Sequence, residues 1–119
     1  MDVINIEFFG SEGKAHNVRF PGEAHASNEV ILGIFYEDIP SVIGAIEYGS
    51  SSDEIIDIGD FINGSVQSET ICLSPEGIDS KSYIVRKTDL LNALNEWAVF
   101  KQTNQSGNVK VVTVGGHSC

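Results

Sequence analysis

The segment KTDLLNALNEWAVFK, residues 87–101, carries the clearest periodicity in the sequence. Its large apolar side chains, Leu90, Leu94 and Trp97, recur at intervals of three and four residues, which places them on one face of an α-helix. Thr88 can cap the first turn, the acid that follows it suits the positive end of the helix dipole, and the lysine at position 101 suits the negative end. A helix with one apolar face must be covered by another layer, so this segment requires a sheet or further helices elsewhere in the chain.

Most other apolar residues lie in short runs separated by turn residues, which is typical of β-strands. We expect extended structure in VINIEFF (3–9), KAHNVRF (14–20), EVILGIFYED (29–38), SVQSETICLS (65–74), KSYIVRK (81–87) and VKVVTV (109–114). The first two runs predict an N-terminal hairpin, and PEGIDS at 75–80 predicts a second hairpin between its neighbours. The run at 29–38 is continuously apolar, which predicts a strand covered on both faces at the centre of the sheet.

Two segments in the middle of the chain are harder to interpret. IPSVIGAIEYG, residues 39–49, favours a short helix or turn followed by extended chain, because a proline near the start suits a first helical turn. SSDEIIDIGDFING, residues 51–64, predicts a helix, since a period of 100° per residue separates its aspartates from its isoleucines. Ser51 and Glu54 can form a capping box, and Asn63 with the next glycine can end the helix. The alternative is a hairpin that turns at this Asn-Gly pair.

These elements predict an α+β fold with a mainly antiparallel sheet and two principal helices. The length of 119 residues suits one globular domain spanning 1–119, and it is sufficient for a hydrophobic core without a metal or disulfide. We find no internal repeat or linker that would divide it.

The charge distribution is strongly uneven. The chain has 17 acids against 7 bases and a net charge of -10, and no lysine or arginine occurs between Arg19 and Lys81. This interval, the cation-free tract, contains Glu23, Glu29, Glu37, Asp38, Glu47, Asp53, Glu54, Asp57, Asp60, Glu69, Glu76 and Asp79. Nucleic acid and anionic membranes are disfavoured as ligands, because binding them requires cations. A basic protein is the favoured partner, since opposite fields accelerate encounter.

The start of the sequence lacks a signal-peptide pattern, and no apolar run is long enough to span a bilayer. The two cysteines, Cys72 and Cys119, form neither a metal-ligand spacing nor a disulfide framework. We therefore expect a soluble cytoplasmic protein in which Cys72 is a reduced, buried small hydrophobe.

No motif supports catalysis, a cofactor or a metal site. The acids at 53–60 lack the spacing and the loop of a calcium site, and nothing indicates the desolvated carboxylate that acid–base catalysis requires. His16, His25 and His117 are isolated from other ligand types, and the glycines match no nucleotide-binding loop.

Tyrosines beside acids remain as the strongest indication of a binding surface, since interfaces combine aromatic anchors with a polar rim. The candidate partner-binding residues are Tyr36, Glu37, Asp38, Glu47, Tyr48, Asp53, Glu54, Asp57 and Asp60. A plain solvated surface is the alternative interpretation of these acids.

In overall character, and in the stretch YEDIPSVIGAIEYGSSSDEIIDIGD at 36–60, the chain resembles small acidic bacterial immunity proteins, including those of contact-dependent growth inhibition systems. The resemblance implies a non-catalytic protein that binds one-to-one to a basic toxin domain, such as a nuclease, and neutralises it. Three other functions stay open: a phage-type anti-defence protein that mimics nucleic acid, a small enzyme that uses carboxylates or a bound metal, and a plain subunit of a larger assembly.

Overall fold

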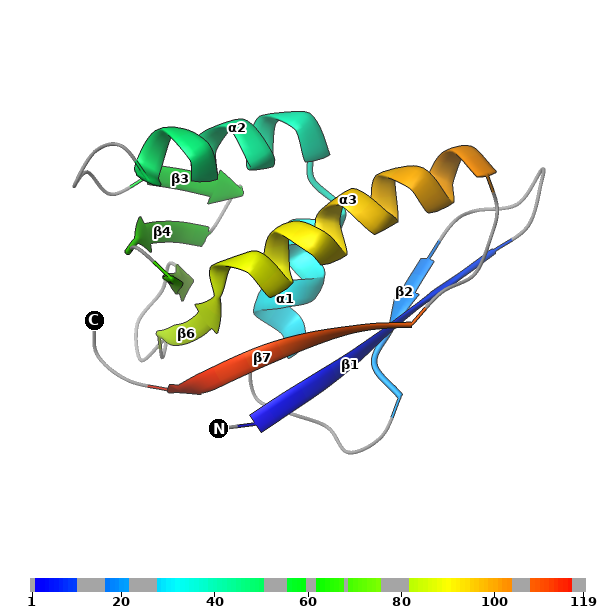
Figure 1. Cartoon of the computed structure of the whole chain (residues 1–119), viewed down its shortest axis with the longest axis horizontal. Helices are drawn as coiled ribbons and strands as arrows, with labels where there is room; N and C mark the ends of the chain where they lie inside the picture. The colour runs from blue at the N-terminus through cyan, green and yellow to red at the C-terminus, as the bar shows by residue number, and fades with distance from the viewer. Residues whose placement is uncertain are drawn as a thin grey trace.

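A computed structural model describes residues 2–10, 17–21, 28–50, 56–59, 62–67, 69–75, 82–103 and 108–116. Within these ranges the chain forms seven strands and three helices (Figure 1). In chain order they are β1 (Asp2–Phe9), β2 (Asn17–Arg19), α1 (Asn28–Phe35), α2 (Ile39–Ser50), β3 (Ile56–Gly59), β4 (Ile62–Val66), β5 (Thr70–Pro75), β6 (Tyr83–Arg86), α3 (Lys87–Thr103) and β7 (Asn108–Gly116).

The strands form one sheet in the order β2-β1-β7-β6-β5-β4-β3. Every pairing is antiparallel, so the predicted α+β class with a mainly antiparallel sheet is confirmed, with three helices in place of two. The segment containing α1 and α2 leads from β2 at one edge of the sheet to β3 at the other. The two predicted hairpins, β1–β2 and β5–β6, are present.

One face of the sheet packs against the helices. On β1 the side chains of Ile4, Ile6 and Phe8 are buried, whereas the alternate Val3 and Asn5 are exposed, as expected for a strand with a single covered face. Among the described elements the opposite face carries no helix, and we call it the helix-free face.

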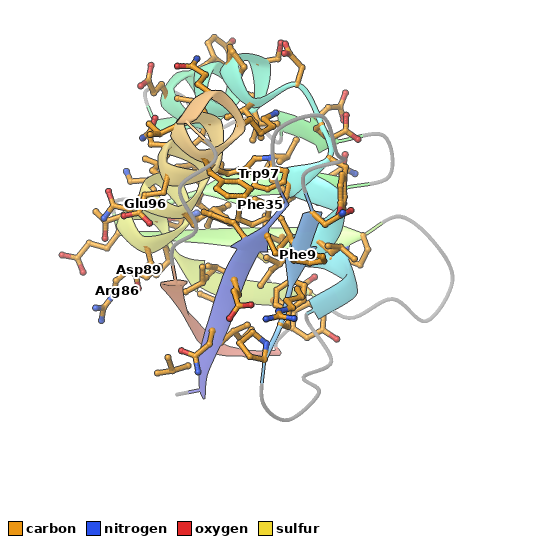
Figure 2. All side chains as sticks on the ribbon, turned by 90° about the vertical axis from the view of Figure 1, so that its right-hand side faces the viewer. Phe9, Phe35, Arg86, Asp89, Glu96 and Trp97 are labelled. Atoms are coloured by element: carbon orange, nitrogen blue, oxygen red, sulfur yellow. The ribbon has the colours of Figure 1, made fainter. Side chains whose placement is uncertain are left out.

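An aromatic cluster joins the sheet to two helices. Phe8 of β1 lies 5.8 Å from Phe35 of α1, 5.1 Å from Trp97 of α3 and 5.8 Å from Phe100, between ring centroids. Figure 2 shows Phe35 and Trp97 close together in the interior. All four side chains are at most 2% exposed. Tilted aromatic pairs at these distances add to the stabilisation that burial provides.

The predicted central strand at 29–38 is wrong. Residues 28–35 form α1, in which the fully buried Ile31, Ile34 and Phe35 follow the helical spacing. Val30 and Leu32 are also packed against the core, so the helix contacts apolar neighbours on most of its circumference. A helix in that setting is apolar all round, and its sequence cannot be told from a buried strand by periodicity.

The interpretation of 39–49 is correct in its helical part only. The whole of Ile39–Ser50 is helical, and the predicted extended continuation is absent. Asp38 is the N-cap, since its backbone carbonyl accepts the amide of Val42 and its carboxylate accepts a hydrogen bond from the Ser41 hydroxyl. Pro40 lies in the first turn, where a missing amide proton costs nothing.

The predicted helix at 51–64 is also wrong. Ile56–Gly59 and Ile62–Val66 are the antiparallel strands β3 and β4, while residues 51–55 and 60–61 lie outside the described ranges. Asn63 pairs with Asp57 inside the ladder, so the alternative of a turn at Asn63 is wrong as well. Exposed Asp57 next to buried Ile58 follows the strand period of two. A short pattern of aspartate and isoleucine is compatible with both the helical period and the strand period.

The strongest helix prediction is confirmed as α3, with Asp89 in its first turn and Lys101 in its last. The predicted cap is misplaced, because the helix begins at Lys87, directly after β6, so that Thr88 lies inside the first turn. The predicted final strand is confirmed as part of β7.

Cys72 is buried, as expected, but it is not a reduced thiol: it is disulfide-bonded. The prediction of a reduced Cys72 is therefore wrong. The cysteines no longer support a cytoplasmic location. No helix in the described ranges is both long and apolar enough to cross a membrane.

Candidate functional site

The structure divides the nine predicted partner-binding residues among several elements. Tyr36, Glu37 and Asp38 form the connection between α1 and α2, while Glu47 and Tyr48 lie in the last turns of α2. Asp57 is on β3. Asp53, Glu54 and Asp60 lie outside the described residues. The proposed helical row of Asp53, Asp57 and Asp60 does not form, because Asp57 belongs to a strand.

One side of α2 faces solvent. Its exposed residues recur at helical spacing, and we call them the α2 outer face: Pro40, Ser41, Gly44, Glu47 and Tyr48. The other side is buried through Ile39, Val42 and Ile46 against β3, β4 and α3 (Figure 1). The sequence-based prediction found Glu47 and Tyr48 and missed the other three. A full helix at 39–50 would have revealed them, because Gly44, Ser41 and Pro40 lie four, seven and eight residues before Tyr48, which places them on the same side of a helix.

The centre of the α2 outer face is open. A Cβ atom at Gly44 would have no neighbour within 4 Å, so the backbone at this position is accessible to a partner. One turn further on, Tyr48 is 56% exposed. Glycine in the exposed centre of a helix costs about 0.5–1 kcal/mol relative to alanine, so its presence there is unfavourable for the helix alone. Close approach of a partner to the backbone is one use that compensates for this cost.

Tyr36, a predicted partner-binding residue, also makes contacts within the fold. Its ring is 55% exposed, but its hydroxyl accepts a hydrogen bond from the Val18 amide and donates one to the Asn17 side-chain oxygen, both at 3.4 Å. Its ring also lies edge-on to Trp97 at 6.4 Å. These contacts hold the connection between α1 and α2 against the edge strand β2. The hydroxyl of Tyr36 therefore accepts an amide of the edge strand that would otherwise be open to pairing with another chain.

The acids beside Tyr36 are also partly structural. Glu37 is half-buried, and its amide donates to the Ile34 carbonyl at 3.2 Å. Asp38, the N-cap residue of α2, is exposed, and its carboxylate accepts a hydrogen bond from the hydroxyl of Ser41 in the first turn. Mutation of Asp38 would weaken the helix as well as remove a charge. Glu47 is exposed in the middle of the polar side of α2, and among the predicted acids it is the better probe of docking.

The cation-free tract of the sequence forms one end of the sheet and its covering helices. It includes α1, α2, β3, β4 and β5, and in Figure 1 α2, β3 and β4 lie together, away from the crossing of β1 and β7. Three cations outside this tract are engaged in the fold. Arg19 forms an ion pair with Glu7 and lies 5.2 Å above the Phe9 ring, Lys101 lies 5.4 Å from the Trp97 ring, and Lys87 donates to the Gln67 carbonyl at 3.5 Å.

The described part of the chain can be compared with what metal binding and acid–base catalysis require. There, no three histidine, cysteine, aspartate or glutamate side chains gather in a group that could hold a metal ion. The acids of the α2 region are exposed or half-buried at the ends and outer surfaces of elements. A general acid or base requires instead a carboxylate desolvated in a cleft.

Comparison of the chain with protein-family models, curated proteins and solved structures found no match.

Proposed function

We propose that this protein is a non-catalytic acidic binding protein that docks on a basic protein surface through the α2 outer face. The observation that carries the proposal is the position of Tyr48 and Glu47 beside the open backbone at Gly44, on a helix from the cation-free tract. The exposed aromatic ring can anchor a partner, and the accessible backbone allows the partner to approach closely. The carboxylate supplies negative charge, and all three lie within two turns of the helix.

The particular function that we propose within this class is that of an immunity or inhibitor protein, which neutralises a toxin domain, most simply a nuclease, by one-to-one binding. A nuclease domain is basic because it must neutralise phosphates, so its surface complements the cation-free tract. The small size of the chain and its negative charge suit a stoichiometric inhibitor, and the resemblance noted in the sequence favours the same assignment.

Nucleic-acid mimicry has less support. A mimic presents carboxylates in a regular array that follows phosphate positions, and the row of aspartates predicted on one helix at 53–60 does not form. The described acids Glu37, Glu47 and Asp57 lie instead on a connection, a helix and a strand. These positions suit an irregular protein surface better than a repeating backbone.

Co-expression with the product of the adjacent gene tests the proposal. We expect a complex of one copy of each chain by size-exclusion chromatography with light scattering, an association rate that falls with added salt, and loss of the partner's activity in the complex. A partner that binds with no salt dependence, or that keeps its activity when saturated, contradicts an inhibitor working through charge complementarity. Binding to a protein that recognises DNA, competed by DNA, would favour the mimic.

A further inference from the structure

The strand β3 lies at one end of the sheet, and among the described strands it pairs with β4 alone. At the other end of the sheet, on β2, the hydroxyl of Tyr36 accepts the Val18 amide. The edge of a terminal strand offers backbone amides and carbonyls for pairing with another chain. The backbone groups of β3 that point away from β4 are therefore the ones that an added strand would use.

The alternation of the ladder identifies these groups. The Gln67 amide donates to the Thr70 carbonyl at 2.8 Å, so these two residues form a hydrogen-bonded pair where β4 turns into β5. Such pairs recur at every second residue of an antiparallel ladder, so Asn63, four residues before Gln67, bonds toward β5. Asp57, the partner of Asn63 on β3, then forms a non-hydrogen-bonded pair with it. The amide and the carbonyl of Asp57 consequently point outward from the edge of the sheet.

The side chains of β3 add a charge preference to this edge. Ile58 is buried on the face that packs against α2, so the exposed Asp57 lies on the helix-free face. A residue of an added strand directly opposite Asp57 would have its Cα atom about 5.5 Å away. Opposite charges in such cross-strand pairs are favourable and like charges are unfavourable. Two copies of this chain paired about Asp57 would bring their carboxylates together, so the edge disfavours self-association and favours a cationic strand.

We propose that the β3 edge accepts an extended segment of a basic protein as an additional strand, with a lysine or arginine opposite Asp57. The charge of this end of the molecule supports that occupant, since β3 belongs to the cation-free tract. The edge is also continuous with the proposed docking surface, because α2 packs on β3 and the two lie together in Figure 1. The choice of a basic protein as the occupant rests on the proposed function, to which the edge adds a backbone contact.

NMR titration with short peptides tests the edge directly. The probe is the peptide TVKVT with blocked ends, whose lysine can pair with Asp57 while both valines point to the face of α2. We expect the Asp57 amide to show one of the largest chemical-shift changes. The matched peptide TVEVT should bind on the order of 3–10-fold more weakly at low salt. TVKVT methylated on its lysine amide should lose the shift, because it cannot donate to the Asp57 carbonyl. An unshifted Asp57 amide, or equal affinity for the lysine and glutamate peptides, would overturn the proposal.

Reversing the charge of the edge provides the matched variant. Asp57→Lys changes an exposed side chain and should reverse the preference, so that TVEVT binds more tightly than TVKVT. Glu96→Lys on the exposed side of α3 changes the net charge equally and should keep the wild-type preference for TVKVT. If Asp57→Lys keeps the wild-type preference, or if both variants lose it to the same extent, Asp57 does not select the strand.

Hydrogen exchange in the complex with the co-expressed partner separates this proposal from the proposed function. We expect slower exchange at the Asp57 amide in the complex, with the Val18 amide at the opposite edge as the internal reference. A partner that is bound and neutralised while exchange at Asp57 is unchanged would overturn the strand addition alone. If the co-expressed partner does not bind, the proposed function fails, and the peptide titration still decides whether the edge accepts a cationic strand.

Discussion

The indole N–H of Trp97 on α3 donates a hydrogen bond of 2.8 Å to the backbone carbonyl of Phe35, the last residue of α1. The bond is buried and spans 62 positions of sequence. The last carbonyls of a helix have no partner within it, so Trp97 supplies one from another helix. The same side chain therefore fills the aromatic cluster and fixes the end of α1.

Replacement of Trp97 by phenylalanine should remove the hydrogen bond to Phe35 and keep part of the aromatic packing. The variant keeps an aromatic ring in the cluster but leaves the Phe35 carbonyl without its donor, and a buried unpaired acceptor costs about 1–3 kcal/mol. We expect a corresponding decrease in the free energy of unfolding, measured by urea denaturation. Val99→Ala on the exposed side of the same helix is the control and should change stability by less than about 0.5 kcal/mol. Equal effects of the two substitutions would contradict the capping role.

Tyr36→Phe should open the edge of the sheet at β2. The substitution keeps the ring against Trp97 and removes the hydroxyl that accepts the Val18 amide. We expect faster hydrogen exchange at Val18 and a loss of about 0.5–1 kcal/mol of stability, since the site is partly exposed. The amide of Trp97, inside α3, is the internal reference. Unchanged exchange at Val18 would show that the hydroxyl does not protect this edge.

Gly33 of α1 and Gly44 of α2 should respond differently to a larger side chain. Alanine at Gly44 projects into open space and should stabilise the protein by about 0.5–1 kcal/mol. At Gly33 in α1 an added Cβ atom would lie 3.4 Å from the end of the Ile62 side chain, so leucine there must displace that side chain and should cost about 1–3 kcal/mol. Leucine at Gly44 should lack that cost. Thermal unfolding of the three variants checks the difference, and similar losses at both sites would contradict the packing of α1 on β4.

Charge reversal should locate the docking surface. Glu47→Lys on the α2 outer face should slow association with the co-expressed partner on the order of 3–10-fold at low salt, by stopped-flow measurement. Glu96→Lys, on an exposed position of α3 (Figure 2), changes the net charge equally and is the matched control. If both variants slow association to the same extent, the effect comes from net charge and the α2 outer face is not the contact.

Gly44→Arg tests close approach at the same surface. The arginine places both bulk and positive charge at the open backbone, so we expect binding to a basic partner to weaken by more than tenfold while Tm stays near the wild-type value. Gly44→Ala should bind nearly as well as the wild type. Wild-type affinity in the arginine variant would exclude Gly44 from the interface.

The sequence was sufficient for α3, for the existence of the two hairpins and for the antiparallel class. The single strand predicted at 65–74 is divided, because β4 ends at Val66 and β5 begins at Thr70. The sequence was insufficient at α1, where Val30 and Leu32 contact the core as well as Ile31 and Ile34, so that no polar side reveals the helix. At β3 the pair Asp57–Ile58 alternates over too few residues to exclude a helix. Tertiary contacts with β4 and α2 determine that this segment is a strand. Such contacts cannot be recognised from a local sequence pattern.

The same limit applied to the candidate site. Tyr48 and Glu47 were found from residue type, but their relation to Gly44 depends on a helix that was predicted only in part. The N-cap role of Asp38 and the edge contact of Tyr36 also depend on the path of the chain between α1 and α2. Residue types therefore indicated candidate partner-binding side chains, and the fold separates those that make internal contacts from those that face outward.

The pairing of β1 with β7 has a consequence for how the chain folds. Asp2 lies opposite Thr113 in this ladder, so the sheet joins residues from nearly opposite ends of the described chain. The N-terminal hairpin can form early, but β1 keeps an unpaired edge until β7 has been synthesised. Such distant contacts carry a large loop-closure entropy and slow the folding of small domains. During synthesis the β1 edge is therefore the last part of the sheet to be closed and the part most exposed to pairing with other chains.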